Sequence, residues 1–112
     1  MRPQEAAERA VEGIRSLNDS TVRSGYEHPV EVYAVIVELT LLARGLPRAL
    51  RDAATWLEAE HDAGRVGCDD GENLTLVVHG TVIGLHDAVR HTMSLLHALD
   101  ATTRHAGRLT AR

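Results

Sequence analysis

The chain has 112 residues, of which 44% are hydrophobic, so it is long enough for one domain with a modest core. Aromatic residues make up 3% and Phe is absent, which leaves Leu, Val, Ile and Ala for that core and favours packed helices over a sheet. The net charge of −4 argues against a protein that holds nucleic acid over its whole surface. The single cysteine, Cys68, excludes an internal disulfide and a zinc site of several thiolates within one chain.

Two segments bear on membrane targeting. The first ten residues include Arg2 and Glu5 and lack the apolar core of a signal peptide. The apolar run 30–42 is interrupted by Glu31 and Glu38 and is too short to cross a bilayer. We therefore expect a cytoplasmic protein that has no membrane partner.

Residues 1–28 predict a short N-terminal helix followed by a connection. Pro3 suits the first turn of a helix, and apolar residues then recur at spacings of three and four as far as Leu17. From Asn18 to Pro29 the chain is rich in Asn, Asp, Ser, Thr and Gly, which is typical of a connection.

Residues 29–112 begin with a strong helical pattern, which predicts a helix over about 30–61. Its expected buried seam steps by four and three through Val32, Ile36, Leu39, Ala43, Leu46, Leu50, Ala53 and Leu57. A second set repeats every seven residues beside that seam and widens the apolar stripe: Val35, Leu42, Ala49 and Trp56. Pro47 lacks an amide donor, so a kink or a short break is expected near Arg44.

The segment 62–73 contains three glycines and no periodicity, and is expected to be the loop of a hairpin. Asp69 and Glu72 have the spacing of a capping box, which predicts the start of a second helix, over about 74–104. The expected seam of that helix is Val78, Val82, Leu85, Val89, Thr92, Leu96, Leu99 and Thr103. Its flanking stripe is Thr81, Ala88, Leu95 and Thr102.

The predicted fold class is therefore all-α, a long antiparallel helical hairpin with a short N-terminal helix. Each apolar stripe is wider than one partner helix covers. The N-terminal helix packs on the hairpin, or two hairpins dimerise into a four-helix bundle, or both; dimerisation is the preferred expectation.

The second long helix carries an exposed strip in which histidines recur, and this strip is a possible partner-binding face: His79, Ile83, His86, Arg90, Met93 and His97. His79 and His86 are separated by about 10.5 Å of helical rise, so they share an ion only across a symmetric dimer. Glu58 and His61 form the Glu-x-x-His pair of di-iron bundles, but neither falls on the predicted seam and no second pair exists.

At the end of the chain, Arg104, Arg108 and Arg112 recur every four residues and would form a basic strip if the helix continues. Such cations favour the negative end of a helix dipole. The same strip is a possible nucleic-acid contact.

The sequence predicts no catalytic, cofactor-binding or metal-binding residues, because it has no phosphate-binding glycine loop, nucleophile elbow or paired buried carboxylates. The preferred function is a non-enzymatic homodimeric protein-protein interaction module, such as an adaptor or a small regulatory subunit, whose partner is a second copy or another protein. The alternative is a DNA-associated regulator, and a metal-dependent helical-bundle enzyme is a weaker third.

Several short motifs follow one another along the hairpin: Glu38-Leu39, Leu46-Pro47, Leu50, Trp56-Leu57 and Asp70-Gly71, before a long helix rich in Ala, Leu and His. In these motifs the chain resembles a group of short uncharacterised actinobacterial all-helical proteins, over roughly residues 30–105. The group carries no assigned activity. The resemblance therefore implies a helical fold and no functional residues.

Overall fold

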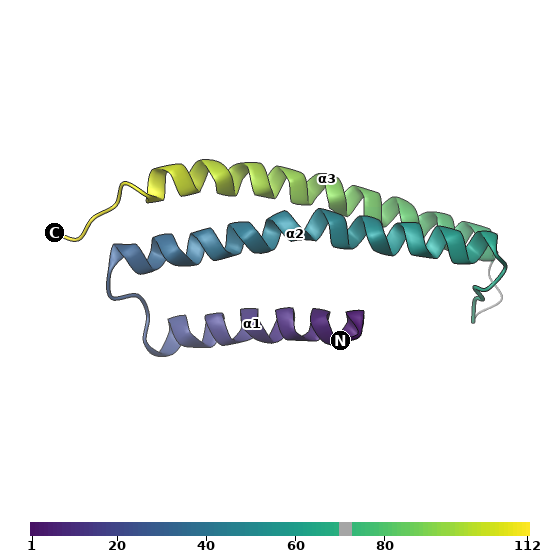
Figure 1. Cartoon of the computed structure of the whole chain (residues 1–112), viewed down its shortest axis with the longest axis horizontal. Helices are drawn as coiled ribbons and strands as arrows, with labels where there is room; N and C mark the ends of the chain where they lie inside the picture. The colour runs from purple at the N-terminus through teal and green to yellow at the C-terminus, as the bar shows by residue number, and fades with distance from the viewer. Residues whose placement is uncertain (70–72) are drawn as a thin grey trace.

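A computed structural model describes the whole chain apart from residues 70–72, and the described residues form three helices and no strand. The helices are α1 (Pro3–Arg23), α2 (Pro29–Asp62) and α3 (Leu74–Ala106). Figure 1 shows α2 and α3 paired along their length as an antiparallel hairpin, with α1 folded back beside α2. The all-α class and the helical hairpin are thus confirmed. None of these helices carries an apolar stretch long enough to span a bilayer.

α1 is longer than the sequence predicted, since it continues past Leu17 to Arg23. The polar residues that suggested a connection bond to the helix itself, for example the Ser20 hydroxyl to the Ser16 carbonyl at 2.8 Å. Because these side chains satisfy backbone and charged groups of their own helix, they do not end it. The turn comes instead at Gly25, whose φ of +66° is a conformation that glycine adopts without a steric penalty.

α2 runs through Pro47 as one continuous helix, so the predicted short break is wrong. Pro47 is buried in the interface with α3, and packing on both sides of it compensates for the backbone hydrogen bond that proline removes.

The buried seam of α2 lies one residue after three of its eight predicted positions. The fully buried residues are Thr40, Ala43, Pro47 and Ala54, whereas the predicted Leu39 and Leu46 are partly buried and Ala53 is exposed. Ala43 is buried as expected, and the predicted Ile36, Leu50 and Leu57 are partly buried. The fully buried positions hold small side chains, which let the two helix backbones approach closely. The larger residues beside them lie at the edge of the interface.

The seam of α3 is confirmed, because Val78, Val82 and Val89 are buried and the pattern extends to Ala106. The cap of this helix was predicted wrongly. α3 starts at Leu74, and the side chain of Asn73 accepts a hydrogen bond from the Leu76 amide at 3.3 Å. Asn caps a helix as well as Asp does, and it stands next to the first helical residue, as the cap must. Glu72 of the predicted capping box, and Asp70-Gly71 of the resemblance, lie outside the described residues.

Polar pairs between α2 and α3 fix the register of the hairpin away from its loop. The Thr40 and Thr103 hydroxyls lie 3.3 Å apart across the seam, and the Arg44 guanidinium donates to Asp100 at 2.8 Å. At the loop end the core is apolar, with Ala54 packed between Val78 and Val82.

The loop is tied back to the end of α2. The Arg65 guanidinium donates to both carboxylate oxygens of Glu60, at 2.6 and 2.9 Å, and this bond raises the pKa of Arg65. Val66 packs on the core that Ala54 forms with α3. The segment that leaves α2 is therefore held close to the hairpin.

α1 is attached more loosely than α3. None of its residues is buried, and no Cα atom of α1 comes within 8 Å of a Cα atom of α2 or α3. Ile14 and Leu17 are only partly buried, although they belong to the apolar face of this helix. The hairpin is therefore the packed part of the fold, and α1 leaves much of its own apolar face uncovered.

Candidate functional site

The hairpin has two long sides, which are defined by the residues that flank the seam. On one side, Arg51 and Thr55 of α2 and His86 and Val89 of α3 line a shallow groove. The next groove towards the loop takes Glu58 and His61 from α2 and His79, Ile83 and His86 from α3. We call this the histidine side.

The opposite flank of each helix is apolar. Residues of an α-helix are about 100° apart around its axis, so Trp56, two residues after the buried Ala54, projects away from α3, and Leu95, two residues after Met93, projects away from Met93. The apolar side consists of the two stripes that the sequence placed beside the seams, Val35, Leu42, Ala49 and Trp56 on α2 and Thr81, Ala88, Leu95 and Thr102 on α3. Trp56 is 64% exposed and Leu95 47% exposed. The hairpin thus presents a long apolar surface to solvent.

α1 covers only the beginning of this apolar side. Leu17 of α1 lines an apolar crevice together with Ala34, Val35, Glu38 and Leu39 at the start of α2. Figure 1 shows α1 ending well before the loop end of the hairpin. Trp56 therefore has no covering helix from its own chain.

The six residues of the predicted partner strip are all exposed on α3 and lie on the histidine side: His79, Ile83, His86, Arg90, Met93 and His97. Three of them, His79, Ile83 and His86, line the groove in front of Glu58 and His61. Arg90 is paired with Asp87 of its own helix. The structure thus joins two candidates that the sequence kept apart, the histidine strip and the Glu-x-x-His pair.

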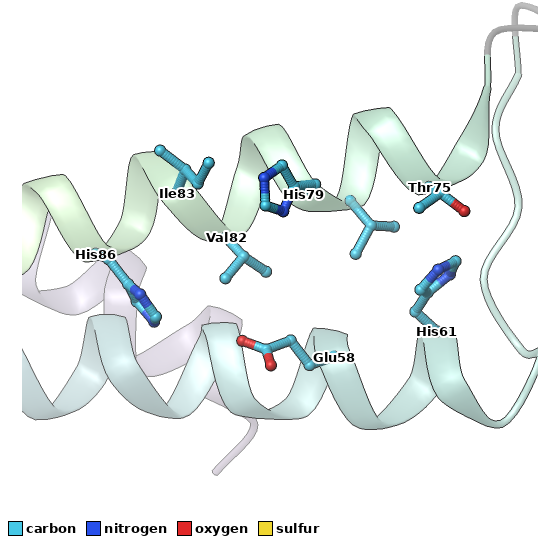
Figure 2. A pocket seen from close by; sticks show the side chains of 8 residues that line it. Glu58, His61, Thr75, His79, Val82, Ile83 and His86 are labelled. Atoms are coloured by element: carbon cyan, nitrogen blue, oxygen red, sulfur yellow. The ribbon is translucent and has the colours of Figure 1, made fainter.

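Figure 2 shows the groove, with the side chain of His61 directed from α2 towards α3 and that of His86 from α3 towards α2, while Glu58 extends along α2 and the ring of His79 lies along α3. Its volume is about 390 Å³, and its floor is formed by Val78 and Val82. The Nδ1 atom of His61 is buried and has no hydrogen-bond partner among the residues that the structure describes. Because a buried polar atom without a partner costs about 1–3 kcal/mol, this nitrogen is an unsatisfied feature of the groove.

The three C-terminal arginines do not form the basic helical strip that was suggested as a nucleic-acid contact. α3 ends at Ala106, so Arg104 lies in its last turn while Arg108 and Arg112 lie beyond it. The chain ends the helix at Gly107, where an added Cβ would lie 3.3 Å from the ring of Tyr33. The three arginines do not share one helical face, and Arg104 is explained by its position at the negative end of the helix dipole.

One cluster of possible metal ligands was not predicted from the sequence. Ligand atoms of Glu27, His28 and Glu31 lie within 4.8 Å of one another at the start of α2. The Glu-His-x-x-Glu spacing is the signal that could have found it. The cluster is largely exposed and lies at the positive end of the helix dipole, which disfavours a cation there.

Comparison of the chain with protein-family models, with curated proteins and with solved structures finds no match.

Proposed function

We propose that this chain is a non-enzymatic helical interaction module that forms a homodimer through the apolar side of its hairpin. The observation that carries the proposal is the amount of exposed surface. The chain exposes 8601 Å², whereas a compact monomer of 12.2 kDa exposes about 6,100 Å². Its radius of gyration is 18.7 Å, against about 13 Å for a compact domain of this length.

This excess of about 2,500 Å² per chain is shared between the hairpin and α1, none of whose residues is buried, so it is an upper limit on the area that a permanent interface could cover. Obligate homodimers bury roughly 2,000–5,000 Å² in total, and two copies of this chain carry about 5,000 Å² of excess. A second copy is therefore an occupant of the right size. The core agrees with this, because no large side chain among the described residues is completely buried within a single chain.

The apolar side is the surface that a second copy would fit best. Its residues repeat every seven positions on both long helices, which is the spacing that packs helices side by side in a bundle. A two-fold axis places the same stripe on both partners and gives a bundle of four long helices, with each α1 at its margin. Trp56 is the residue that we expect to contribute most, because exposed Trp side chains are frequent centres of interfaces.

The test compares Leu95→Arg with Met93→Arg by light scattering coupled to size exclusion, over a range of protein concentrations. Both side chains are 47% exposed on α3, but Leu95 lies on the apolar side and Met93 on the histidine side. We expect the parent and Met93→Arg to be dimers and Leu95→Arg to be a folded monomer. A monomeric parent at high concentration overturns the dimer. Dissociation by Met93→Arg alone would move the interface to the histidine strip.

A further inference from the structure

We propose that the two chains of the homodimer lie parallel, with the two-fold axis along the hairpin, and that Trp56 of each chain packs into a notch at Gly84 of the other. This arrangement rests on the proposed function, because it specifies how the two apolar sides meet. It places α2 of one chain beside α3 of its partner. The register of the hairpin and the sizes of its exposed side chains support it.

The register of the hairpin decides which residues such an axis brings together. A two-fold axis along the hairpin keeps every residue at its own level, so a residue of α2 meets those residues of the partner's α3 that are level with it within one chain. Tyr33 is level with Gly107, since a Cβ added at Gly107 would lie 3.3 Å from the Tyr33 ring. The same number of residues separates Tyr33 from Trp56 as separates Gly84 from Gly107, so Trp56 is level with Gly84. A groove crosses the hairpin at this level and is lined by Arg51, Thr55, His86 and Val89.

Gly84 leaves an open notch on the apolar side of α3. It lies three residues after Thr81 and four before Ala88, so it is within about 60° of both around the helix axis. A Cβ added at Gly84 would meet no atom of the described residues within 4 Å outside its own turn of the helix. Glycine inside a helix weakens it, and one of its uses is the close approach of a neighbour. The Trp56 side chain, which is 64% exposed, is large enough to fill the notch.

The match of sizes continues along the two helices. Steps of seven residues back from Trp56 and forward from Gly84 keep the same faces and the same relative level. All the residues reached in this way are exposed within one chain, and each layer pairs a small residue with a larger one. The layers are Trp56 with Gly84, Ala49 with His91, and Leu42 with Ala98. A second copy therefore fits this surface at three successive levels.

A two-fold axis perpendicular to the hairpin would give a poorer fit. It would place Trp56 against the open end of the partner hairpin, where Leu17 of α1 lines a crevice with Val35 and so covers part of the apolar side. In the parallel arrangement Trp56 meets α3, and α1 has no Cα atom within 8 Å of a Cα atom of that helix. Figure 1 shows α2 lying between α1 and α3. The partner's α1 therefore leaves the notch accessible.

The first experiment measures the dissociation constant of the homodimer by sedimentation equilibrium for the parent, Gly84→Leu and Gly80→Leu. Gly80 lies two residues after the buried Val78 and two before the buried Val82, so it points away from α2, and it too has open space at its Cβ position. Both substitutions replace a poor helix former of α3 by a good one.

We expect Gly84→Leu to raise the dissociation constant at least about tenfold, because leucine fills the notch, and Gly80→Leu to change it less than about twofold. In a Trp56→Ala background the notch has no occupant, so Gly84→Leu should then change the constant less than about twofold. Trp56 is the single tryptophan of the chain, so its fluorescence also reports on the contact. The emission should shift to the blue when the parent dimerises and back to the red in Gly84→Leu.

The second experiment measures the relative direction of the chains. A spin label is attached to Ala63→Cys in a Cys68→Ser background, because Ala63 is exposed at the loop end of α2. Parallel chains bring both labels to one end, less than about 35 Å apart, since neighbouring helices lie about 8–10 Å apart. A perpendicular axis separates the labels by about 50 Å, which is the length of α2.

Labels about 50 Å apart in a dimeric parent would overturn the parallel arrangement and leave the homodimer standing. Equal weakening by Gly84→Leu and Gly80→Leu would do the same. A monomeric parent would overturn both the homodimer and the contact of Trp56 with Gly84.

Discussion

The position of the seam on α2 makes Ala54 and its neighbour Ala53 a sharp test of the packing. Ala54 is 1% exposed and lies between Val78 and Val82, while Ala53 is exposed beside it. Ala54→Leu adds three carbon atoms where the helices are in contact, and such overpacking costs about 1–3 kcal/mol of unfolding free energy. For a chain of 112 residues, this corresponds to a Tm lower by about 4–12 °C.

The matched variant Ala53→Leu makes the same chemical change one residue earlier and should alter the unfolding free energy by less than about 0.5 kcal/mol. Both variants are measured by urea unfolding followed by far-UV circular dichroism, at a protein concentration where each has the oligomeric state of the parent. An equal loss in both variants, or a larger loss in Ala53→Leu, would show that the seam follows the phase predicted from the sequence and that the packing described for α2 is wrong.

Three further predictions are checked by the same unfolding measurement. Asn73→Ala should lower stability by about 1 kcal/mol because it removes the cap of α3, whereas Asp69→Ala should leave stability unchanged; the reverse order would restore Asp69 as the cap. Thr40→Val should cost no more than about 1 kcal/mol, because the Thr103 hydroxyl loses its contact with Thr40 but still donates to the Leu99 carbonyl, and adding Thr103→Val should recover part of that loss. Gly64→Ala should cost about 1 kcal/mol because Gly64 has a φ of +75°, so an unchanged Tm would contradict that backbone geometry.

Local patterns in the sequence were sufficient for the helices and for the seam of α3. On α3 the predicted seam contains the buried residues Val78, Val82 and Val89, whereas the apolar residues outside that seam, such as Val77 and Leu95, are exposed. The polar end of α1 was misjudged because Ser20 and Thr21 are common in loops. In this chain their hydroxyls bond to carbonyls of their own helix, an arrangement that composition does not reveal.

The candidate groove could not be predicted from the pattern on either helix alone. Glu58 and His61 were recognised as a pair, and His79 and His86 as a strip, but each set is incomplete on its own helix. Their meeting depends on the register of α2 against α3, which polar pairs such as Arg44 with Asp100 fix from the far end of the hairpin. Spacing along one helix carries no information about that register.

By itself, the sequence determined that this chain is all-α, that two long helices form a hairpin, and that their apolar stripes exceed what one hairpin covers. The tertiary structure decided which phase of the wide stripe on α2 is buried, because Leu39 and Thr40 both continue a regular heptad and only the approach of α3 selects between them. That choice turns Trp56 outward onto the apolar side and leaves Glu58 and His61 lining a groove with His79. The proposed homodimer depends on this rotation of α2, since a helix with two equivalent apolar seams takes its orientation from the partner against which it packs.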